Sequence, residues 1–236
     1  MPEGQTPPPP PTPPTEPPPP PPPPGYEPPR AAPAPAPSGR YPIDYEVEYA
    51  TQRNRLTTFF RIILAIPWAI VGAVYEVLAA VFALAAWVAL VITGHYPRTL
   101  YEWNTGILRY HGRFGGFLYL ATDAWPPFGW AEDPHHPQRV PVAPPAASQS
   151  RLMAFFRLIL AVPLFVVVYA LGYILQGASI GSWLVIVFRG YQPSWLQNTI
   201  VAAWRWHIRA AGYLLLLTDI YPPVGDEAPA LAAATA

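Results

Sequence analysis

The stretch RLTTFFRIILAIP at residues 55–67 returns as RLMAFFRLILAVP at residues 151–163, which lies 96 residues further along the chain. The same offset relates later positions without a gap. The further matches pair Trp87 with Trp183, Gly94-x-x-Pro97 with Gly190-x-x-Pro193, Arg109-x-His111-x-Arg113 with Arg205-x-His207-x-Arg209, and Thr122-Asp123-x-x-Pro126-Pro127 with Thr218-Asp219-x-x-Pro222-Pro223. Such a duplication predicts two tandem, pseudo-symmetric modules that pack on each other.

Each copy of the motif opens a long apolar stretch, at residues 59–93 and 155–188. About 20 apolar residues suffice for one span, so these stretches are long for one span and short for two. We predict a mainly α-helical membrane protein. Arginines flank both ends of each stretch, and the positive-inside rule places both ends on one side. This favours a membrane helical hairpin in each module, turning near Tyr75-Glu76 and near Gln176-Gly177. The alternative is one long tilted span.

The remaining chain divides by composition. Residues 1–40 are dominated by proline, which predicts a disordered, semi-rigid arm and a candidate docking tract for a protein partner; the alternative is a spacer. The start of the chain lacks the features of a signal peptide, so we expect insertion through internal segments. We place membrane module 1 at residues 41–130, a polar linker at 131–150, membrane module 2 at 151–225 and a flexible tail at 226–236.

Short strands are also expected. Ile43 to Tyr49 alternates apolar and acidic residues, the period of a half-buried strand. A candidate partner for this strand is the apolar run from Phe117 to Leu120.

Two segments that follow the apolar stretches, residues 98–113 and 193–209, mix aromatic, aliphatic and cationic side chains. This mixture is typical of amphipathic segments in the headgroup plane. The candidate lipid-headgroup ligands in them are Arg109, His111, Arg113, Arg205, His207 and Arg209. Arg61 and Arg157 join this set, because an arginine near the start of a membrane helix is expected to snorkel to the interface. The spacing of two within R-x-H-x-R aligns side chains on an extended segment and not on a helix, which leaves the local structure open.

Three acidic residues are candidates for special roles. Glu76 lies within the first apolar stretch, where it is a hydrated turn residue in the hairpin arrangement or an intramembrane proton or cation site in the single span. Its counterpart in the second module is the uncharged Gly172. Asp123 and Asp219 precede Pro-Pro pairs and are expected to set turns by bonding their own backbone, with an ion pair to Arg113 or Arg209 as a second role.

Composition excludes several function classes. The chain has no cysteine, which excludes disulfides, thiolate nucleophiles and cysteine-bound metals. Asp133-Pro134-His135-His136-Pro137 lacks the i, i+4 spacing of a helical metal site, so we expect neither a metal nor a cofactor. The balance of 14 basic and 14 acidic residues does not indicate nucleic-acid binding. Because no phosphate loop, hydrolase elbow or metalloprotease signature is present, we expect no enzymatic activity.

The motifs R-L-x-x-F-F-R, Trp followed by Gly-x-x-Pro, R-x-H-x-R and T-D-x-[WY]-P-P resemble the DUF4389 family of bacterial membrane proteins, in two tandem copies between about Tyr41 and Val224. The resemblance implies a Tyr-Pro-led strand ahead of each module. Tyr41-Pro42 supplies it in the first module, and the second offers Arg139-Val140-Pro141-Val142. The resemblance implies a membrane location and no particular activity.

We therefore expect a non-enzymatic integral membrane scaffold or accessory protein, multi-pass in the bacterial inner membrane, with a cytoplasmic N-terminus. The expected partners are membrane lipids and a protein bound through the arm, and the oligomeric state stays open. The alternative is a small transporter or channel that uses Glu76 within a pseudo-symmetric bundle. An enzyme that acts on lipids has only the arginine clusters to support it and ranks last.

Overall fold

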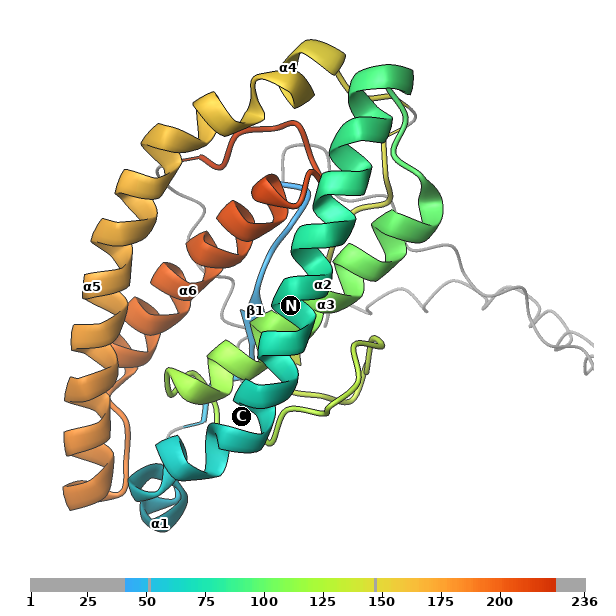
Figure 1. Ribbon diagram of the computed structural model, residues 1–236. Coiled ribbons are helices and arrows are strands. Elements are labelled where there is room, and N and C mark those ends of the chain that lie inside the picture. Colours follow the sequence, from blue (N-terminus) through green and yellow to red (C-terminus); the bar gives the residue numbers. More distant parts are fainter. Residues whose placement is uncertain (1–40, 51, 147, 224–236) are drawn as a thin grey trace, which may run out of the picture. The chain divides into compact units, whose positions relative to one another are not determined.

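The computed structural model describes residues 41–50, 52–146 and 148–223. The predicted arm at residues 1–40 and the predicted tail at residues 226–236 lie outside them. The described chain is mainly helical (Figure 1). Its elements, in order, are β1 (Glu46–Val47), α1 (Arg55–Phe59), α2 (Arg61–Thr93), α3 (Arg98–Leu118), β2 (Gln138–Arg139), α4 (Arg151–Phe155), α5 (Arg157–Arg189) and α6 (Ser194–Leu214).

The helices of the two modules begin and end at positions 96 residues apart, so the sequence repeat is also a structural repeat. Both short first helices are capped by a polar side chain. The Asn54 side chain accepts a hydrogen bond from the Thr57 backbone at 3.1 Å, and the Ser150 hydroxyl accepts one from Met153 at 3.3 Å.

The predicted hairpins are wrong. Each apolar stretch forms one continuous helix of 33 residues, α2 and α5, and Tyr75-Glu76 and Gln176-Gly177 lie in mid-helix. A single glycine inside a helix costs only about 1 kcal/mol, so Gly177 does not break α5. The structure therefore agrees with the alternative of one long helix in each module.

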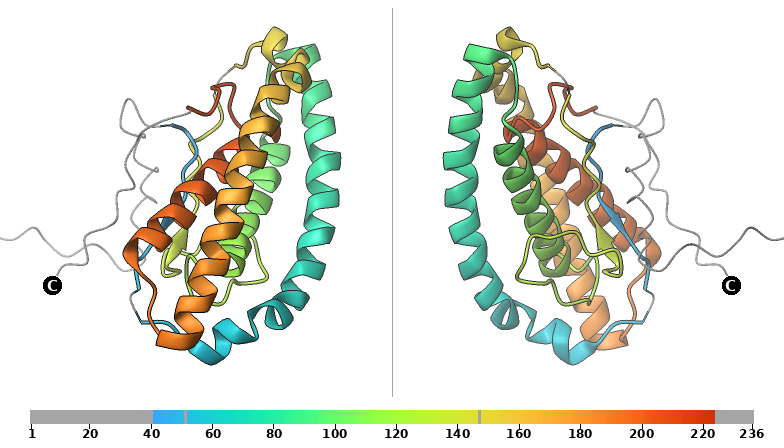
Figure 2. Two further views of the ribbon diagram at one scale, coloured as in Figure 1. Left: turned by 90° about the vertical axis from the view of Figure 1, so that its left-hand side faces the viewer. Right: turned by 90° about the vertical axis from the view of Figure 1, so that its right-hand side faces the viewer.

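The helices and strands form three layers. α2 packs on α3, α5 packs on α6, and α3 packs on α6. The strands contact the middle layer, β2 against α3 and β1 against α6. Figure 2 shows α2 at one edge of the molecule and the strands near the opposite edge, with α3 between them. The long apolar helices and the strands thus lie on opposite faces of the middle layer.

The two modules are joined by reciprocal contacts. The Trp87 indole donates to the Ala154 carbonyl at 2.9 Å, and Trp183 donates to the Thr58 carbonyl at 3.1 Å. The start of each module therefore lies beside the end of the long helix of the other module. It follows that α2 and α5 run antiparallel and that the pseudo-symmetry is two-fold (Figure 1).

The strand partner predicted at Phe117 to Leu120 is also wrong, because that run begins as the end of α3. β1 pairs antiparallel with β2, with Glu46 opposite Arg139, and an isolated bridge joins Ile43 to Val142. The segment from Arg139 to Val142 is thus the partner of the first strand. The Phe117 ring is fully buried and lies against the Arg61 guanidinium.

Candidate lipid-contact surface

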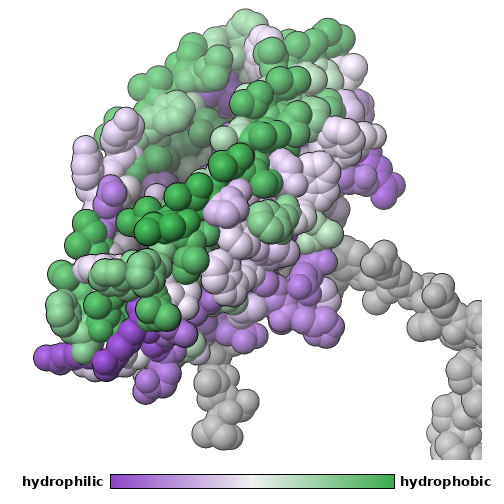
Figure 3. Space-filling model, turned by 60° about the horizontal axis from the view of Figure 1, so that its bottom comes forward, coloured by the Kyte–Doolittle hydropathy of each residue, from purple (hydrophilic) through white to green (hydrophobic). Residues whose placement is uncertain are grey.

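The helices α1, α2, α4 and α5 expose an unusual number of large apolar side chains, which we call the apolar surface. From α1 and α2 it contains Leu56, Phe59, Ile62, Ile63, Ile66, Ile70, Val74, Val77, Val81, Leu84, Val88 and Ile92, and from α4 and α5 it contains Leu152, Met153, Phe155, Leu158, Ile159, Val162, Phe165, Val166, Tyr169, Tyr173, Ile174, Ile180, Leu184 and Phe188. Figure 3 shows hydrophobic side chains spread over one part of the molecule and hydrophilic side chains gathered along another edge.

Both long helices are long and apolar enough to cross a membrane, and only 17% of the most apolar window of each is buried. The core helix of a soluble protein is mostly buried instead. Soluble monomers rarely expose contiguous apolar patches larger than a few hundred Å². The apolar surface is therefore a candidate contact with lipid.

The predicted snorkelling of Arg61 and Arg157 is wrong, because both side chains turn inward and are almost fully buried. The Arg61 guanidinium donates to the carbonyls of Phe117 and Thr122 and forms an ion pair with Asp123. In the second module Arg157 donates to the Thr218 carbonyl at 2.9 Å. Arg61 thus fastens the start of α2 to the turn after α3, and Arg157 fastens the start of α5 to the turn after α6.

The two aspartates were expected to set these turns, but the threonines beside them do so. The Thr122 hydroxyl accepts from the Ala124 backbone at 3.3 Å, and the Thr218 hydroxyl accepts from Ile220 at 3.1 Å. Asp123 accepts from the Asn54 backbone at 2.9 Å and pairs with Arg61, not with Arg113.

Asp219 is half-buried and interacts electrostatically with Arg157, the counterpart of Arg61. The predicted ion pair of Asp219 with Arg209 is wrong, because Arg209 binds Asp44 instead, at 3.3 Å.

The R-x-H-x-R segments are helical, so each pair of arginines shares one helix face and the histidine lies on another. Arg205 binds Asp44 at 2.8 Å, beside the contact of Arg209 with the same carboxylate, and both arginines are buried. This ion triplet joins α6 to the segment before β1. These two arginines, like Arg61 and Arg157, are therefore not placed to meet lipid headgroups.

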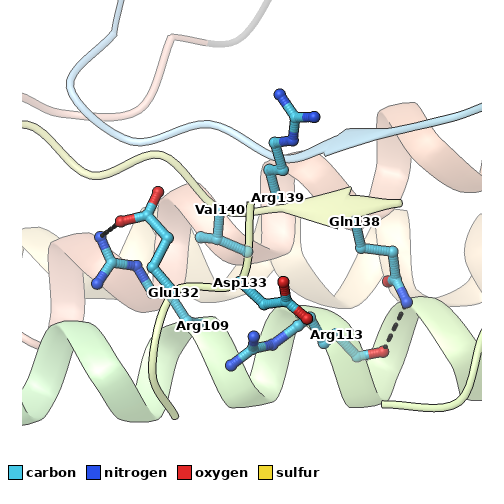
Figure 4. A pocket seen from close by; sticks show the side chains of 7 residues that line it. All are labelled: Arg109, Arg113, Glu132, Asp133, Gln138, Arg139 and Val140. Carbon is cyan, nitrogen blue, oxygen red and sulfur yellow. Dashed lines mark hydrogen bonds and ion pairs between the residues drawn. The ribbon is translucent and has the colours of Figure 1, made fainter. Parts of the chain in front are cut away.

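The matching pair in α3 surrounds a small hollow of about 10 Å³ beside β2 (Figure 4). Arg113 is buried and donates to the carbonyls of Ala131 and Gly129 at 2.9 and 3.0 Å, and Arg109 binds Glu132 at 2.9 Å. Burial lowers the pKa of Arg113, and the nearby charge of Arg109 acts in the same direction. The hollow has room for about one water molecule.

The two histidines of these motifs both lie beside the Trp204 ring, at centroid distances of 5.3 Å for His111 and 5.9 Å for His207. Glu76, exposed in the middle of α2, binds His111 at 2.8 Å. Its counterpart Gly172 faces His207, so the second module has the histidine without the acid. Burial lowers the pKa of His207, which also hydrogen-bonds the Ala203 carbonyl.

A larger cavity of about 430 Å³ lies between the modules, and sequence reasoning missed it. Its lining comes from the end of α3 at residues 118–120, from Gln176, Ser179, Ile180 and Trp183 of α5, and from Arg61 and Ile62. No sequence signal marks it, because its walls come from residues more than 50 positions apart. Its mostly apolar walls suit an apolar or amphipathic molecule.

Within the described ranges, no group of three or more His, Cys, Asp or Glu could hold a metal ion. Of the paired histidines of the linker, His136 is buried. Its Nδ1 accepts a hydrogen bond from the Gln138 backbone at 3.2 Å, and its Nε2 lies 3.2 Å from the Trp125 carbonyl.

Comparison with known proteins gives one result. The model of a protein family described as "Domain of unknown function (DUF4389)" matches residues 55–129 and residues 151–224, one match in each module. No curated protein and no solved structure matches the chain.

Proposed function

The chain belongs to the DUF4389 family, with two tandem copies of the domain, and from this premise we propose that it is a non-enzymatic integral membrane protein that acts as a scaffold or accessory subunit. The proposal places it in the inner membrane of a bacterial cell with its N-terminal arm in the cytoplasm. Its main lipid contact is the apolar surface, because the arginines expected at headgroups are engaged within the chain.

The observation that carries the proposal is the apolar surface. Val77 and Val81, for example, are 65% and 57% exposed near the middle of α2, where no other element of the described chain covers them. Burying an exposed valine side chain in an apolar environment contributes about 1.5 kcal/mol or more, so this surface as a whole favours lipid strongly over water.

Membrane fractionation tests the membrane part of this proposal. We expect the full chain to stay in membranes after extraction with alkaline carbonate and to be released by detergent. Val77→Lys should lower its recovery in the membrane fraction, because a lysine in a membrane helix costs about 3 kcal/mol. Glu48→Lys, at an exposed position of the strand face, is the matched control and should leave the recovery in the membrane fraction unchanged. A chain that is soluble without detergent would contradict the proposal.

The scaffold role requires a protein partner. Purification of the full chain in a mild detergent should therefore recover a second protein in a fixed ratio, and recovery of the chain alone would count against this role.

A small transporter or channel is the second candidate, favoured by the contact of Glu76 with His111 at 2.8 Å. If Glu76 carries a proton or cation, Glu76→Gln should abolish ion flux into reconstituted vesicles, whereas Glu102→Gln, a change of an exposed acid in α3, should not. Equal flux in the two variants and the wild type would remove this candidate. The lipid-acting enzyme keeps no support of its own, because it depended on arginines that contact carbonyls and carboxylates of the chain.

A further inference from the structure

We propose that the two long helices lie in the plane of one membrane leaflet and do not cross the bilayer. The partner of the apolar surface is then the acyl-chain layer of a single leaflet. This inference rests on the proposed function, because it assumes that the apolar surface meets lipid.

The first argument is the length of the helices. A helix of 33 residues such as α2 or α5 is about 50 Å long. The hydrocarbon core is about 30 Å thick, so a spanning helix of this length would have to tilt by about 53° to keep its apolar residues inside it. Membrane helices tilt by about 20° on average and by no more than about 40°.

The second argument is that each long helix has an extended companion of similar length. Tyr41 donates to the Ile220 carbonyl, close to Thr218 and hence to the start of α5, and Arg53 donates to the Gly190 carbonyl at the end of α5. The described residues between Tyr41 and Arg53 therefore extend from beside one end of α5 to the other end.

The described residues between His136 and Gln149 accompany α2 in the same way. His136 bonds the Trp125 carbonyl, and the Trp125 ring packs on Trp68 in the second turn of α2. At the other end, Gln149 donates to the carbonyl of Gly94, where α2 stops. Because these contacts lie at or near opposite ends of each helix, each segment accompanies most of the length of its helix.

If α2 and α5 crossed a bilayer, both extended segments would have to cross it with them. Their outward residues are not suited to lipid, because Glu48 and Arg139 are exposed. The two segments pair with each other, but the sheet has only two strands in the part of the chain that the structure describes, so the outer edge of each has no strand partner there. Extended backbone with open edges does not occur against lipid, where unpaired N–H and C=O groups cost several kcal/mol each. The strand face therefore belongs in water.

The layer order gives the same result. The apolar surface lies on one side of α3 and α6, and the strands lie on the other (Figure 2). A two-sided molecule of this kind fits a membrane surface. Its long helices enter the acyl chains, its middle helices lie at headgroup depth, and its strands face water.

The exposed arginines complete the argument. Arg55 and Arg189 lie at one end of the antiparallel helix pair, and Arg98 and Arg151 lie at the other. In a spanning arrangement they would place positive charge equally on both faces of the membrane, against the positive-inside rule. In the plane of one leaflet, all four can reach the same anionic headgroups.

Sidedness of labelling tests the inference. The chain has no native cysteine, and the exposed residues Gln52 and Ser148 are pseudo-equivalent positions at opposite ends of the long helices. We expect Gln52→Cys, Ser148→Cys and Glu48→Cys all to react with an impermeant maleimide from the same side of the membrane. If Gln52→Cys and Ser148→Cys label from opposite sides, the helices cross the bilayer and the inference is overturned.

Depth measurements provide an independent test. Spin labels at the exposed positions Ile62, Val77 and Ile92 sample the start, middle and end of α2. In the plane of a leaflet the three labels have similar exposure to oxygen and similar protection from a water-soluble relaxation agent. A maximum of depth at Val77 with shallow ends would indicate a span. Unfolding curves in detergent that match the cysteine-free parent show that each variant is folded.

Failure of this inference can be told from failure of the proposed function. Release of the full chain by alkaline carbonate contradicts both. Retention in carbonate together with labelling of the two ends from opposite sides contradicts only the in-plane arrangement.

Discussion

Arg61 and Arg157 illustrate how single residues are used in this protein. An arginine within an apolar stretch must reach water or find partners. Here the partners are backbone carbonyls and a carboxylate of the turn that ends the same module, together with the rings of Phe117 and Tyr213 at 4.5 and 3.9 Å. The snorkelling prediction failed because these partners lie 56 to 62 residues away in sequence, where no local pattern indicates them.

Replacement of Arg61 should strongly lower the free energy of unfolding. Arg61→Ala leaves Asp123 and two buried carbonyls without this donor, and breaking a buried pair costs about 3–5 kcal/mol. Arg98→Ala, which removes an exposed i, i+4 partner of Glu102, should cost about 0.5 kcal/mol or less. Denaturant unfolding in detergent measures both, and equal losses would show that Arg61 does not fasten the module.

His207 should make the fold sensitive to acid. Because burial lowers the pKa of His207 in the folded state, the unfolded state binds a proton more readily below about pH 6.5. The folded state therefore loses stability as the pH falls through that value. Between about pH 7.5 and about pH 5.5, we expect the Tm of His207→Gln to fall less than the Tm of the wild type.

The matched control is His135→Gln at an exposed position of the linker, which should keep the pH dependence of the wild type. If the Tm of both variants falls as much as that of the wild type over this pH range, another group is responsible for any acid sensitivity.

At the scale of elements, the ends of the long helices are where the two modules meet. Gly94 and Gly190 end α2 and α5 in the left-handed conformation, with φ of 76° and 78°. Each lies against an arginine of the other module, Arg151 beside Gly94 and Arg55 beside Gly190. The Gly-x-x-Pro motif of the sequence is therefore both a helix stop and a contact between modules.

Gly177 within α5 and Gly190 at its C-cap should respond to alanine in opposite directions. Gly190→Ala places a side chain at positive φ and a methyl group 2.8 Å from the Arg55 guanidinium, so we expect a loss of about 1–2 kcal/mol or more. Gly177→Ala lies in mid-helix with nothing within 4 Å, so we expect a gain of about 0.5–1 kcal/mol. Thermal unfolding in detergent measures both changes. A stabilising Gly190→Ala would show that the left-handed end is not required.

At the scale of the whole molecule, the two modules form one cooperative structure. Besides the reciprocal tryptophan contacts, Arg205 and Arg209 of module 2 bind Asp44, and the Trp204 indole donates to the Gly112 carbonyl at 3.0 Å. These contacts are buried, so separation of the modules would expose unpaired charges and apolar side chains to solvent or lipid.

Cleavage of the linker tests this unity. A protease site inserted between Pro145 and Ala146, both exposed, should be cut without loss of structure. We expect the two fragments to co-elute in a mild detergent with an unchanged circular dichroism spectrum. Separation of folded fragments would show that the covalent linker, and not the interface, holds the modules together.

The sequence by itself determined the duplication, the family, the mainly helical class and the two long apolar stretches, because these depend on composition and on a repeat that can be read along the chain. Only the tertiary structure decided that each stretch is one helix, that β1 pairs with β2, and that Arg61, Arg113, Arg157, Arg205 and Arg209 are buried. The physical reason is the range of the interactions. A periodic pattern reports which side of a helix is apolar, but the Asp44 that neutralises Arg209 lies 165 residues away, and only the folded chain brings the two together.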